Sequence, residues 1–165
     1  MLKRIKAWLE GRESPPPSRD GRLHDERRKA AAALLVEAAH LDGHYGAEER
    51  ARVRAILSER FGLAPAEAAA LAEAGESAQA EAVDIFRFTR RAAMEQSEAE
   101  RIGLIEMLWE VVYADGVEHP YESNLMRRVT GLLHLSDQQS GAARQRVLER
   151  LRRGTSAASE TTPGA

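Results

Sequence analysis

Cysteine is absent from the 165 residues of this chain. Disulfides, thiolate metal sites and catalysis by a thiol are therefore excluded, and the composition fits a reducing compartment. No apolar run approaches the roughly 20 residues that a membrane-spanning helix needs. The sequence also lacks a Gly-rich phosphate loop, a serine in a nucleophile-elbow frame and the paired Glu-x-x-His motifs of di-metal helical enzymes. These absences argue against an enzyme.

Positive charge is scarce in the middle of the chain, although the formal net charge is only −2. Residues 3–29 carry nine Lys or Arg against five Asp or Glu, and residues 144–153 carry five arginines against one glutamate. Residues 30–143 carry ten basic against nineteen acidic side chains. An acidic body repels phosphate, so we expect no nucleic-acid partner.

The first segment, residues 1–11, contains "LKRIKAWLE", which predicts a short amphipathic helix. Basic side chains surround an apolar face, and tryptophan suits the interface of a membrane with anionic headgroups. The sequence therefore predicts peripheral membrane contact through this face, with a partner-binding or core-capping helix as the alternative. The face comprises Leu2, Ile5, Trp8 and Leu9.

Three further segments follow. Residues 12–23 contain three consecutive prolines, which favour extended backbone and predict a linker. Residues 24–153 have helical periodicity almost throughout and predict one all-α domain. Residues 154–165 are small and polar, which predicts a disordered tail.

About seven helices are expected in the domain. The first ends at Gly43, and the third, a short one, ends near Gly75. Glycine, proline or capping-box signals mark the predicted starts of the second to seventh helices. These signals are Gly46, Pro65, Ser77 (with Ala82, Ile85, Phe86, Thr89 and Ala93 at helical spacing), Ser97 with Glu100, Pro120, and Ser136 with Gln139.

A pattern of acids occurs twice, 73 residues apart. The shared frame is E-x4-D-G-x5-E-x4-R, beginning at Glu37 and again at Glu110. The shift also places Leu35 on Leu108. Two copies are too few, and the period too long, for a solenoid. The repeat predicts a bundle built from two related helical hairpins.

The repeated acids have two interpretations. In the first, each is a helix signal: the Asp-Gly glycine ends one helix, and Glu49 or Glu122 favours the positive end of the next. Asp42 and Asp115 fit less well, because we expect them in the last turn, where the helix dipole disfavours an anion by roughly 0.3–1 kcal/mol. The following amide groups, an arginine or a divalent cation could offset this repulsion. No EF-hand frame is present, and both interpretations remain open.

The segments "LLVEAAHLDGHYGAEE" and "LWEVVYADGVEHPYE", with "DIFRFTRRAAMEQSEAERIGLIEMLWEV" overlapping the second, resemble the tellurite-resistance TerB-like family over about residues 24–150. The resemblance implies an all-helical bundle, no known catalytic activity and a carboxylate cluster that binds divalent cations. Matched residue by residue, this cluster comprises Glu37, Asp42, Glu49, Glu110, Asp115 and Glu122.

One departure puts equal binding by the two halves in doubt, because the second turn has His119-Pro120-Tyr121 where the first has Gly46-Ala47-Glu48. The resemblance also implies protein partners in a stress-response complex and a cytoplasmic location, peripheral to the bacterial inner membrane. We therefore expect a non-enzymatic stress-response module that binds Ca²⁺ or another divalent cation. The alternatives are a metal-independent protein-interaction adapter and a carboxylate-metal hydrolase that uses Glu37, Glu110 and the aspartate pair.

Overall fold

The computed structural model describes residues 19–159 except for short gaps at 42, 82–83, 85, 87–88, 91–93, 95 and 116–119. Side chains are described from residue 25 to residue 156, apart from the same gaps and residue 115. The predicted N-terminal helix at 1–11 lies outside the described residues.

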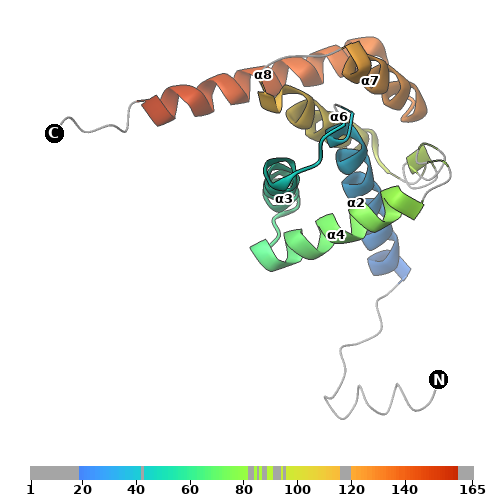
Figure 1. Ribbon diagram of the computed structural model, residues 1–165. Helices are drawn as coiled ribbons and strands as arrows, with labels where there is room; N and C mark the ends of the chain where they lie inside the picture. Colours follow the sequence, from blue (N-terminus) through green and yellow to red (C-terminus); the bar gives the residue numbers. More distant parts are fainter. Residues whose placement is uncertain are drawn as a thin grey trace, which may run out of the picture.

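All regular structure in the described residues is helical, which confirms the predicted all-α fold (Figure 1). The described residues contain six α-helices and one short 3₁₀ helix as full elements, close to the predicted seven helices. Their bounds are α2 Arg19–Ala39, α3 Ala47–Phe61, α4 Pro65–Glu81, α6 Glu98–Val112, η1 Tyr113–Asp115, α7 Pro120–Leu132 and α8 Asp137–Ser159.

Small side chains allow α2 and α4 to cross in close contact (Figure 1). Helix α2 contributes a run of buried alanines, and α4 contributes Ala68, Ala72 and Gly75, all buried. A Cβ atom added at Gly75 would lie 2.7 Å from the Cβ of Ala32 and 2.8 Å from its carbonyl carbon. Glycine at this position is therefore required by the approach of two backbones rather than by a turn.

Helix α6 is the centre of the core and packs against α2, α3, α7 and α8. A helix with apolar residues on most sides is stable only when neighbours cover it. Leu108 of α6 and its repeat equivalent Leu35 of α2 are both fully buried, and each contributes roughly 1.5–3 kcal/mol to stability. The buried residues of α6 are Leu104, Ile105, Met107, Leu108, Trp109, Val111 and Val112.

Most predicted helix starts are correct. Helices α3, α4 and α7 begin directly after Gly46, at Pro65 and at Pro120. The Ser97 side chain accepts from the amide of Glu100, whose carboxylate accepts from the amide of Ser97 at 2.7 Å, as the capping box predicts. Ser136 and Gln139 form the equivalent pair at the start of α8.

The predicted helix end at Gly75 and the predicted start at Ser77 are wrong. Helix α4 runs without a break from Pro65 to Glu81. Gly75 allows α4 to pack closely against α2 and does not end a helix. Ser77 lies inside α4, where serine is tolerated without capping a helix. Of the residues expected on that fourth helix, Ala82, Ile85 and Ala93 lie outside the described residues.

Three other boundaries differ from the expectation. Helix α2 begins at Arg19, inside the predicted linker, because the prolines end at Pro17 and nothing after them forbids helical backbone. It ends at Ala39, three residues before Asp42. Helix α8 continues to Ser159, beyond the expected end at Arg153. Within the described residues, none of these helices has the length and apolarity needed to cross a bilayer.

Candidate functional site: a cavity between two acidic turns

The first acidic turn is fixed by its glycine. Gly43 has a φ of +82°, in the left-handed region that favours glycine, and its N–H donates to the carbonyl of His40 at 2.9 Å. The predicted need for glycine here is therefore confirmed. Because α2 already ends at Ala39, however, the Asp-Gly pair follows the helix instead of closing its last turn.

Tyr45 attaches this turn to α4. Its hydroxyl donates to a carboxylate oxygen of Glu76 at 3.1 Å, and Arg50 lies 3.4 Å from the same oxygen. The rings of His40 and Tyr45 stack with centroids 4.4 Å apart. Burial, together with the charge of Glu76 and this hydrogen bond, raises the pKa of Tyr45, so the hydroxyl remains a donor at neutral pH.

Glu49 caps the helix that follows the turn. Its carboxylate accepts from the N–H of Gly46 at 2.8 Å, as expected for an acid at the third position of α3. Glu122, its equivalent 73 positions on, lies in the first turn of α7 and is half-buried. The capping interpretation is therefore confirmed for Glu49, and its second carboxylate oxygen takes no part in that bond.

One cavity of about 150 Å³ lies where the two hairpins meet. Its lining includes three pairs of residues that the 73-residue shift relates. Two pairs come from the ends of α2 and α6, and the third is Glu49 with Glu122 at the starts of α3 and α7. The structure therefore brings equivalent positions of the repeat to one cavity. The pairs are Ala38 with Val111, Ala39 with Val112, and Glu49 with Glu122.

The charged side chains that line this cavity are mainly acidic. Glu48, Glu49 and Glu122 contribute three carboxylates, and Arg52 contributes the single basic side chain. Within the described part of the chain, Arg52 forms no hydrogen bond or ion pair. It also lines a second groove, between α3 and α8. The lining of the cavity thus carries more acidic than basic side chains.

The two aspartates of the repeat are only partly described. Asp42 lies outside the described residues, and for Asp115 the backbone alone is described, in η1. No group of three or more acidic or histidine side chains placed to share a metal ion occurs among the residues described. Any coordination shell at the cavity therefore needs donors beyond Glu49 and Glu122.

Glu37 and Glu110 have other partners. A carboxylate oxygen of Glu37 accepts from the side-chain amide of Gln79 on α4 at 2.8 Å. Glu110 pairs with Arg60 and with Arg150, the latter at 2.9 Å. Neither acid lines the cavity between the turns.

Glu110 belongs to an ion-pair network that joins three helices. Glu106, one turn earlier on α6, pairs with Arg60 of α3 at 3.1 Å. On α8, Arg146 and Arg150 reach Glu106 at 2.6 and 3.3 Å. Arginine can serve two carboxylates at once because its donors form a planar fork.

The electrostatics of this network favour the charged forms. Burial by itself would raise the pKa of Glu106, but the hydrogen bonds and charges of Arg146 and Arg60 outweigh burial and lower it. Burial would likewise lower the pKa of Arg60, yet Glu110 and Glu106 raise it. At neutral pH both groups are therefore charged, as the ion pairs that join α3 and α8 to α6 require.

The sequence contained a signal for this network that the repeat obscured. Glu106 and Glu110 are four residues apart, as are Arg146 and Arg150, so each pair shares one helix face. A pair of acids on one helix and a pair of arginines with the same spacing on another predict that the two helices face each other.

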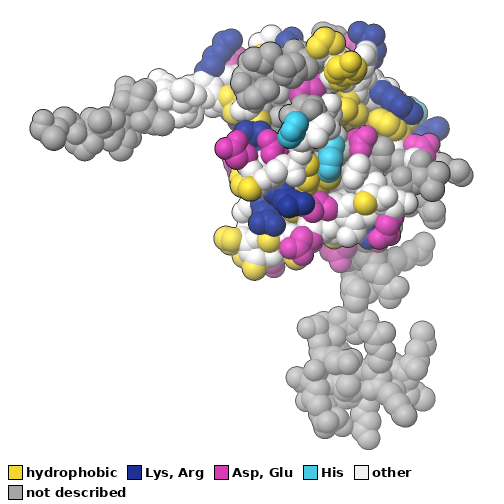
Figure 2. Space-filling view, viewed as in Figure 1, with side chains coloured by type: hydrophobic (Ala, Val, Ile, Leu, Met, Phe, Trp, Pro, Cys, Tyr) yellow, Lys and Arg dark blue, Asp and Glu magenta, His cyan; other side chains and the backbone are white. Residues whose placement is uncertain are grey.

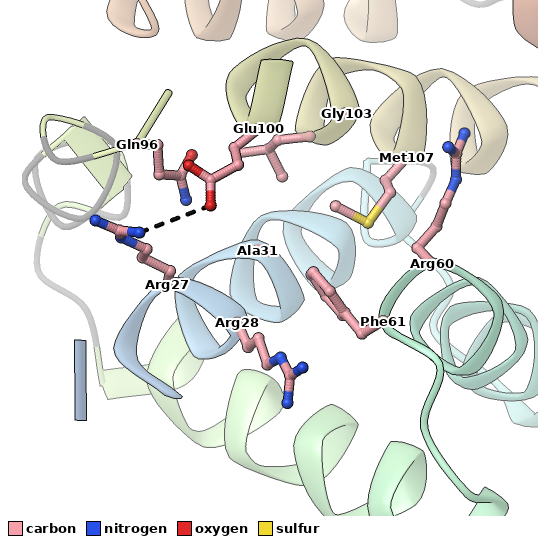
Figure 3. A pocket seen from close by; sticks show the side chains of 10 residues that line it. Arg27, Arg28, Ala31, Arg60, Phe61, Gln96, Glu100, Gly103 and Met107 are labelled. Atoms are coloured by element: carbon pink, nitrogen blue, oxygen red, sulfur yellow. Dashed lines mark ion pairs between the residues drawn. The ribbon is translucent and has the colours of Figure 1, made fainter. Parts of the chain in front are cut away.

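A larger cavity of about 300 Å³ lies between α2, α3 and α6 (Figure 3). Phe61 and Met107 point into it, and at one end Arg27 lies 3.7 Å from Glu100. Arg60 lines it but turns its guanidinium toward the acids of α6. The cavity is mainly apolar and contains no residue of the repeated acid set, so it is not the site that the repeat predicts.

Comparison with known proteins places most of the chain in one family. The family model "Tellurite resistance protein TerB" matches residues 28–145, which include, in whole or in part, each of the six α-helices described above and both acidic turns. Searches of curated proteins and of solved structures gave no match.

Proposed function

Because this chain belongs to the TerB family of tellurite resistance proteins, we propose that it is a non-enzymatic stress-response module that binds a divalent cation between its two acidic turns. The observation that carries the proposal is the convergence of Glu49 and Glu122, equivalent in the repeat, on one cavity. Ca²⁺ and ions like it take carboxylate and carbonyl oxygens as ligands. The lining therefore has the donor chemistry that such an ion needs.

The proposed ligands differ from the full set of six acids. Glu49 and Glu122 provide the first donors. Asp42 and Asp115, which belong to the same two turns, are proposed to complete the shell with water. Glu37 and Glu110 hold α2 and α6 to their neighbours, and we assign them no direct contact with the ion.

The bound ion would offset the repulsion between carboxylates in the cavity. It would also tie the start of α3 to the start of α7, because one ligand comes from each helix. Binding to the native state alone raises stability by RT ln(1 + [L]/Kd), about 2.7 kcal/mol at a hundredfold excess over Kd. Cation binding should therefore be visible as a thermal shift.

The decisive experiment compares wild type with Glu49→Gln/Glu122→Gln by calorimetric titration and thermal unfolding in Ca²⁺, Mg²⁺ and Mn²⁺. Glutamine keeps the oxygen that caps Gly46 but removes the charge, so the fold is preserved. Glu73→Gln, an exposed acid of α4 outside the cavity, is the matched control. Heat and a thermal shift in wild type and control, lost in the double variant, are expected. Absence of both in wild type at millimolar ion would reject cation binding.

We further propose that the module acts within a protein complex at the membrane and catalyses no reaction. The sequence of the 1–11 segment supports membrane contact, and the lack of catalytic motifs supports a binding role. Turnover of phosphoester substrates with added Mn²⁺ would favour the hydrolase alternative. Partner capture that chelator leaves unchanged, in a protein that shows no heat with any ion, would favour the metal-independent adapter.

A further inference from the structure

We propose that the cavity between α2, α3 and α6 binds a small molecule with an apolar body and a single carboxylate group. The cavity encloses about 300 Å³, at the lower end of the range of about 300–1,000 Å³ that is usual for ligand pockets. This is the volume of about ten water molecules in the liquid, which suits a ligand of roughly ten non-hydrogen atoms. No acid of the repeated frame lines the cavity, so the proposal is independent of cation binding.

Apolar side chains from three helices form the body of the site. Ala31 of α2, Phe61 at the end of α3 and Met107 of α6 line it, with Leu104 beside them. Phe61 and Met107 point into the cavity from opposite helices (Figure 3). Such a lining favours an apolar ligand, because binding removes apolar surface of both partners from water.

Gly103 gives the cavity part of its space. The residues of α6 in the lining follow the spacing i, i+3, i+4 and i+7, so they share one helix face, and Gly103 is the second of them. The φ of Gly103 is not in the left-handed region, and a Cβ atom added there would meet nothing within 4 Å. The backbone therefore does not require glycine at this position, and the lack of a side chain leaves open space on the cavity face of α6. The four residues are Glu100, Gly103, Leu104 and Met107.

Arg28 is the arginine of the lining that can receive an anion. Arg60 pairs with acids of α6 outside the cavity, and Arg27 lies 3.7 Å from Glu100. Arg28 forms no hydrogen bond or ion pair within the described part of the chain, although its Nε atom is buried. The carbon of its guanidinium lies 5.4 Å from the centroid of the Phe61 ring. A positive charge therefore lies beside the apolar part of the cavity, and no acid of the described residues neutralises it.

The position of Arg28 selects the class of ligand. Buried N–H groups in proteins nearly always have a hydrogen-bond partner, and a guanidinium binds a carboxylate through charge-assisted hydrogen bonds. Figure 3 shows the guanidinium of Arg28 beside Phe61 and apart from the pair of Arg27 and Glu100. One carboxylate next to Arg28 would satisfy the buried donor, and the apolar body of the same molecule would lie between Phe61 and Met107.

Other occupants fit less well. A cation would be repelled, since the lining contains three arginines and one glutamate. A neutral apolar molecule would leave the buried donor of Arg28 without a partner.

A protein partner needs an apolar surface that continues around the pocket. The exposed large apolar side chains of the described residues are Met94, Tyr121 and Leu151, and none of them lines the cavity. The face of the molecule in Figure 2 likewise carries its hydrophobic side chains in small groups among charged and polar ones.

The test is a calorimetric titration of the full-length chain with octanoate, whose size matches the cavity. Octylammonium has the same alkyl chain with the opposite charge, octanol has no charge, and acetate lacks the chain. EDTA is present throughout, so that no divalent cation contributes. We expect saturable binding of octanoate with a Kd of about 10 µM to 1 mM. Octylammonium and octanol should bind about tenfold more weakly, and acetate should give no heat.

Two substitutions test the two parts of the site. Arg28→Gln removes the positive charge, so it should weaken octanoate binding about tenfold and leave octanol binding unchanged. The preference for the carboxylate is then lost, which a change in packing alone would not produce. Gly103→Leu places a side chain in the cavity and should weaken octanoate and octanol alike, by about tenfold or more.

Arg153→Gln and Gly141→Leu are the matched controls. Arg153 is an exposed arginine of α8 with no hydrogen bond or ion pair in the described part of the chain. Gly141 is an exposed glycine of α8 at which an added Cβ atom also meets nothing within 4 Å. Both controls should bind octanoate as wild type does, and so should Glu49→Gln/Glu122→Gln, which alters only the cavity between the acidic turns. Circular dichroism and thermal unfolding verify that each variant folds.

The proposal is overturned if wild type shows no saturable binding at millimolar octanoate, or if it binds octanol as tightly as octanoate. It is also overturned if Arg28→Gln or Gly103→Leu keeps the wild-type affinity for octanoate. Displacement of octanoate by vesicles of anionic phospholipid would assign the site to a membrane lipid instead of a free carboxylate. Sedimentation that shows a dimer in wild type and a monomer in Gly103→Leu would assign the cavity to a side chain of a second copy.

Discussion

Gly75→Ala should destabilise the domain even though alanine is the better helix former. The new Cβ would lie 2.7 Å from the Cβ of Ala32, 2.8 Å from its carbonyl carbon and 3.0 Å from the amide nitrogen of Ala33. Two of these three atoms are backbone of α2, so no side-chain rotation relieves the contact. Either α2 and α4 separate, or their backbones deform.

Two effects of opposite sign set the magnitude. Overpacking of a filled core costs about 1–3 kcal/mol, and contact with backbone puts this site toward the upper end. Replacing glycine by alanine inside a helix regains roughly 1 kcal/mol. The net loss in free energy of unfolding is therefore about 1–2 kcal/mol, which lowers Tm by about 3–7 °C for a domain of this size.

Urea unfolding followed by circular dichroism measures the change, with Gly141→Ala of α8 as the matched control. A Cβ at Gly141 meets nothing within 4 Å, so that variant should gain about 0.5–1 kcal/mol. Opposite signs for the two substitutions are expected. A Gly75→Ala protein as stable as wild type, with an unchanged m-value, would refute the close approach of α2 and α4.

Three further predictions concern charge. Arg52→Gln should tighten Mn²⁺ binding by roughly three- to tenfold, because it removes a positive charge from the cavity lining. Arg152→Gln, on the exposed end of α8, is the control and should leave the affinity unchanged. If calorimetry gives the same Mn²⁺ affinity for Arg52→Gln and wild type, Arg52 does not oppose cation binding. Arg146 and Arg60 lower the pKa of Glu106 in the folded state. The ion pairs of Glu106 therefore stabilise the fold above the pKa of an unperturbed glutamate, 4.5. This stabilisation is lost as the pH falls through the lower pKa of the folded state. Glu106→Gln should therefore cost about 1–3 kcal/mol at pH 7 and flatten the fall in stability below pH 4.5; a parallel pH profile would speak against the network. Trp8→Glu should abolish flotation with anionic liposomes; wild-type protein that does not float would exclude membrane contact.

Local signals in the sequence predict much of the fold. Capping boxes at Ser97 and Ser136 and prolines at the starts of α4 and α7 act within one turn of helix, so their chemistry is complete in a few adjacent residues. Gly75 misled for the opposite reason. Its cause is a helix 43 positions earlier in the chain, around Ala32, and no local pattern distinguishes a packing glycine from a terminal one.

The candidate site was predictable in part. The repeat relates Glu49 to Glu122, and the structure places both in the lining of one cavity. The roles of Glu37 and Glu110 were not predictable from the same alignment. Gln79, the partner of Glu37, lies 42 residues away on α4, and Arg150, a partner of Glu110, lies 40 residues away on α8. The repeat includes neither helix. Arg60, the other partner of Glu110, lies on α3 beyond the end of the repeated frame.

The acids of the repeated frame fall into two groups, those that hold neighbouring helices and those that line a shared cavity. At the first acid of the frame the copies have diverged: Glu37 accepts from a neutral amide, whereas Glu110 pairs with arginines that attach α3 and α8. At the last acid, Glu49 and Glu122 still face the same cavity. Two equivalent residues can contact one ligand only where the two copies of the frame meet, and residues farther out meet whichever helices the chain places there. Glu49 and Glu122, which line one cavity, are therefore the acids that can share a ligand, whereas Glu37 and Glu110 contact other helices.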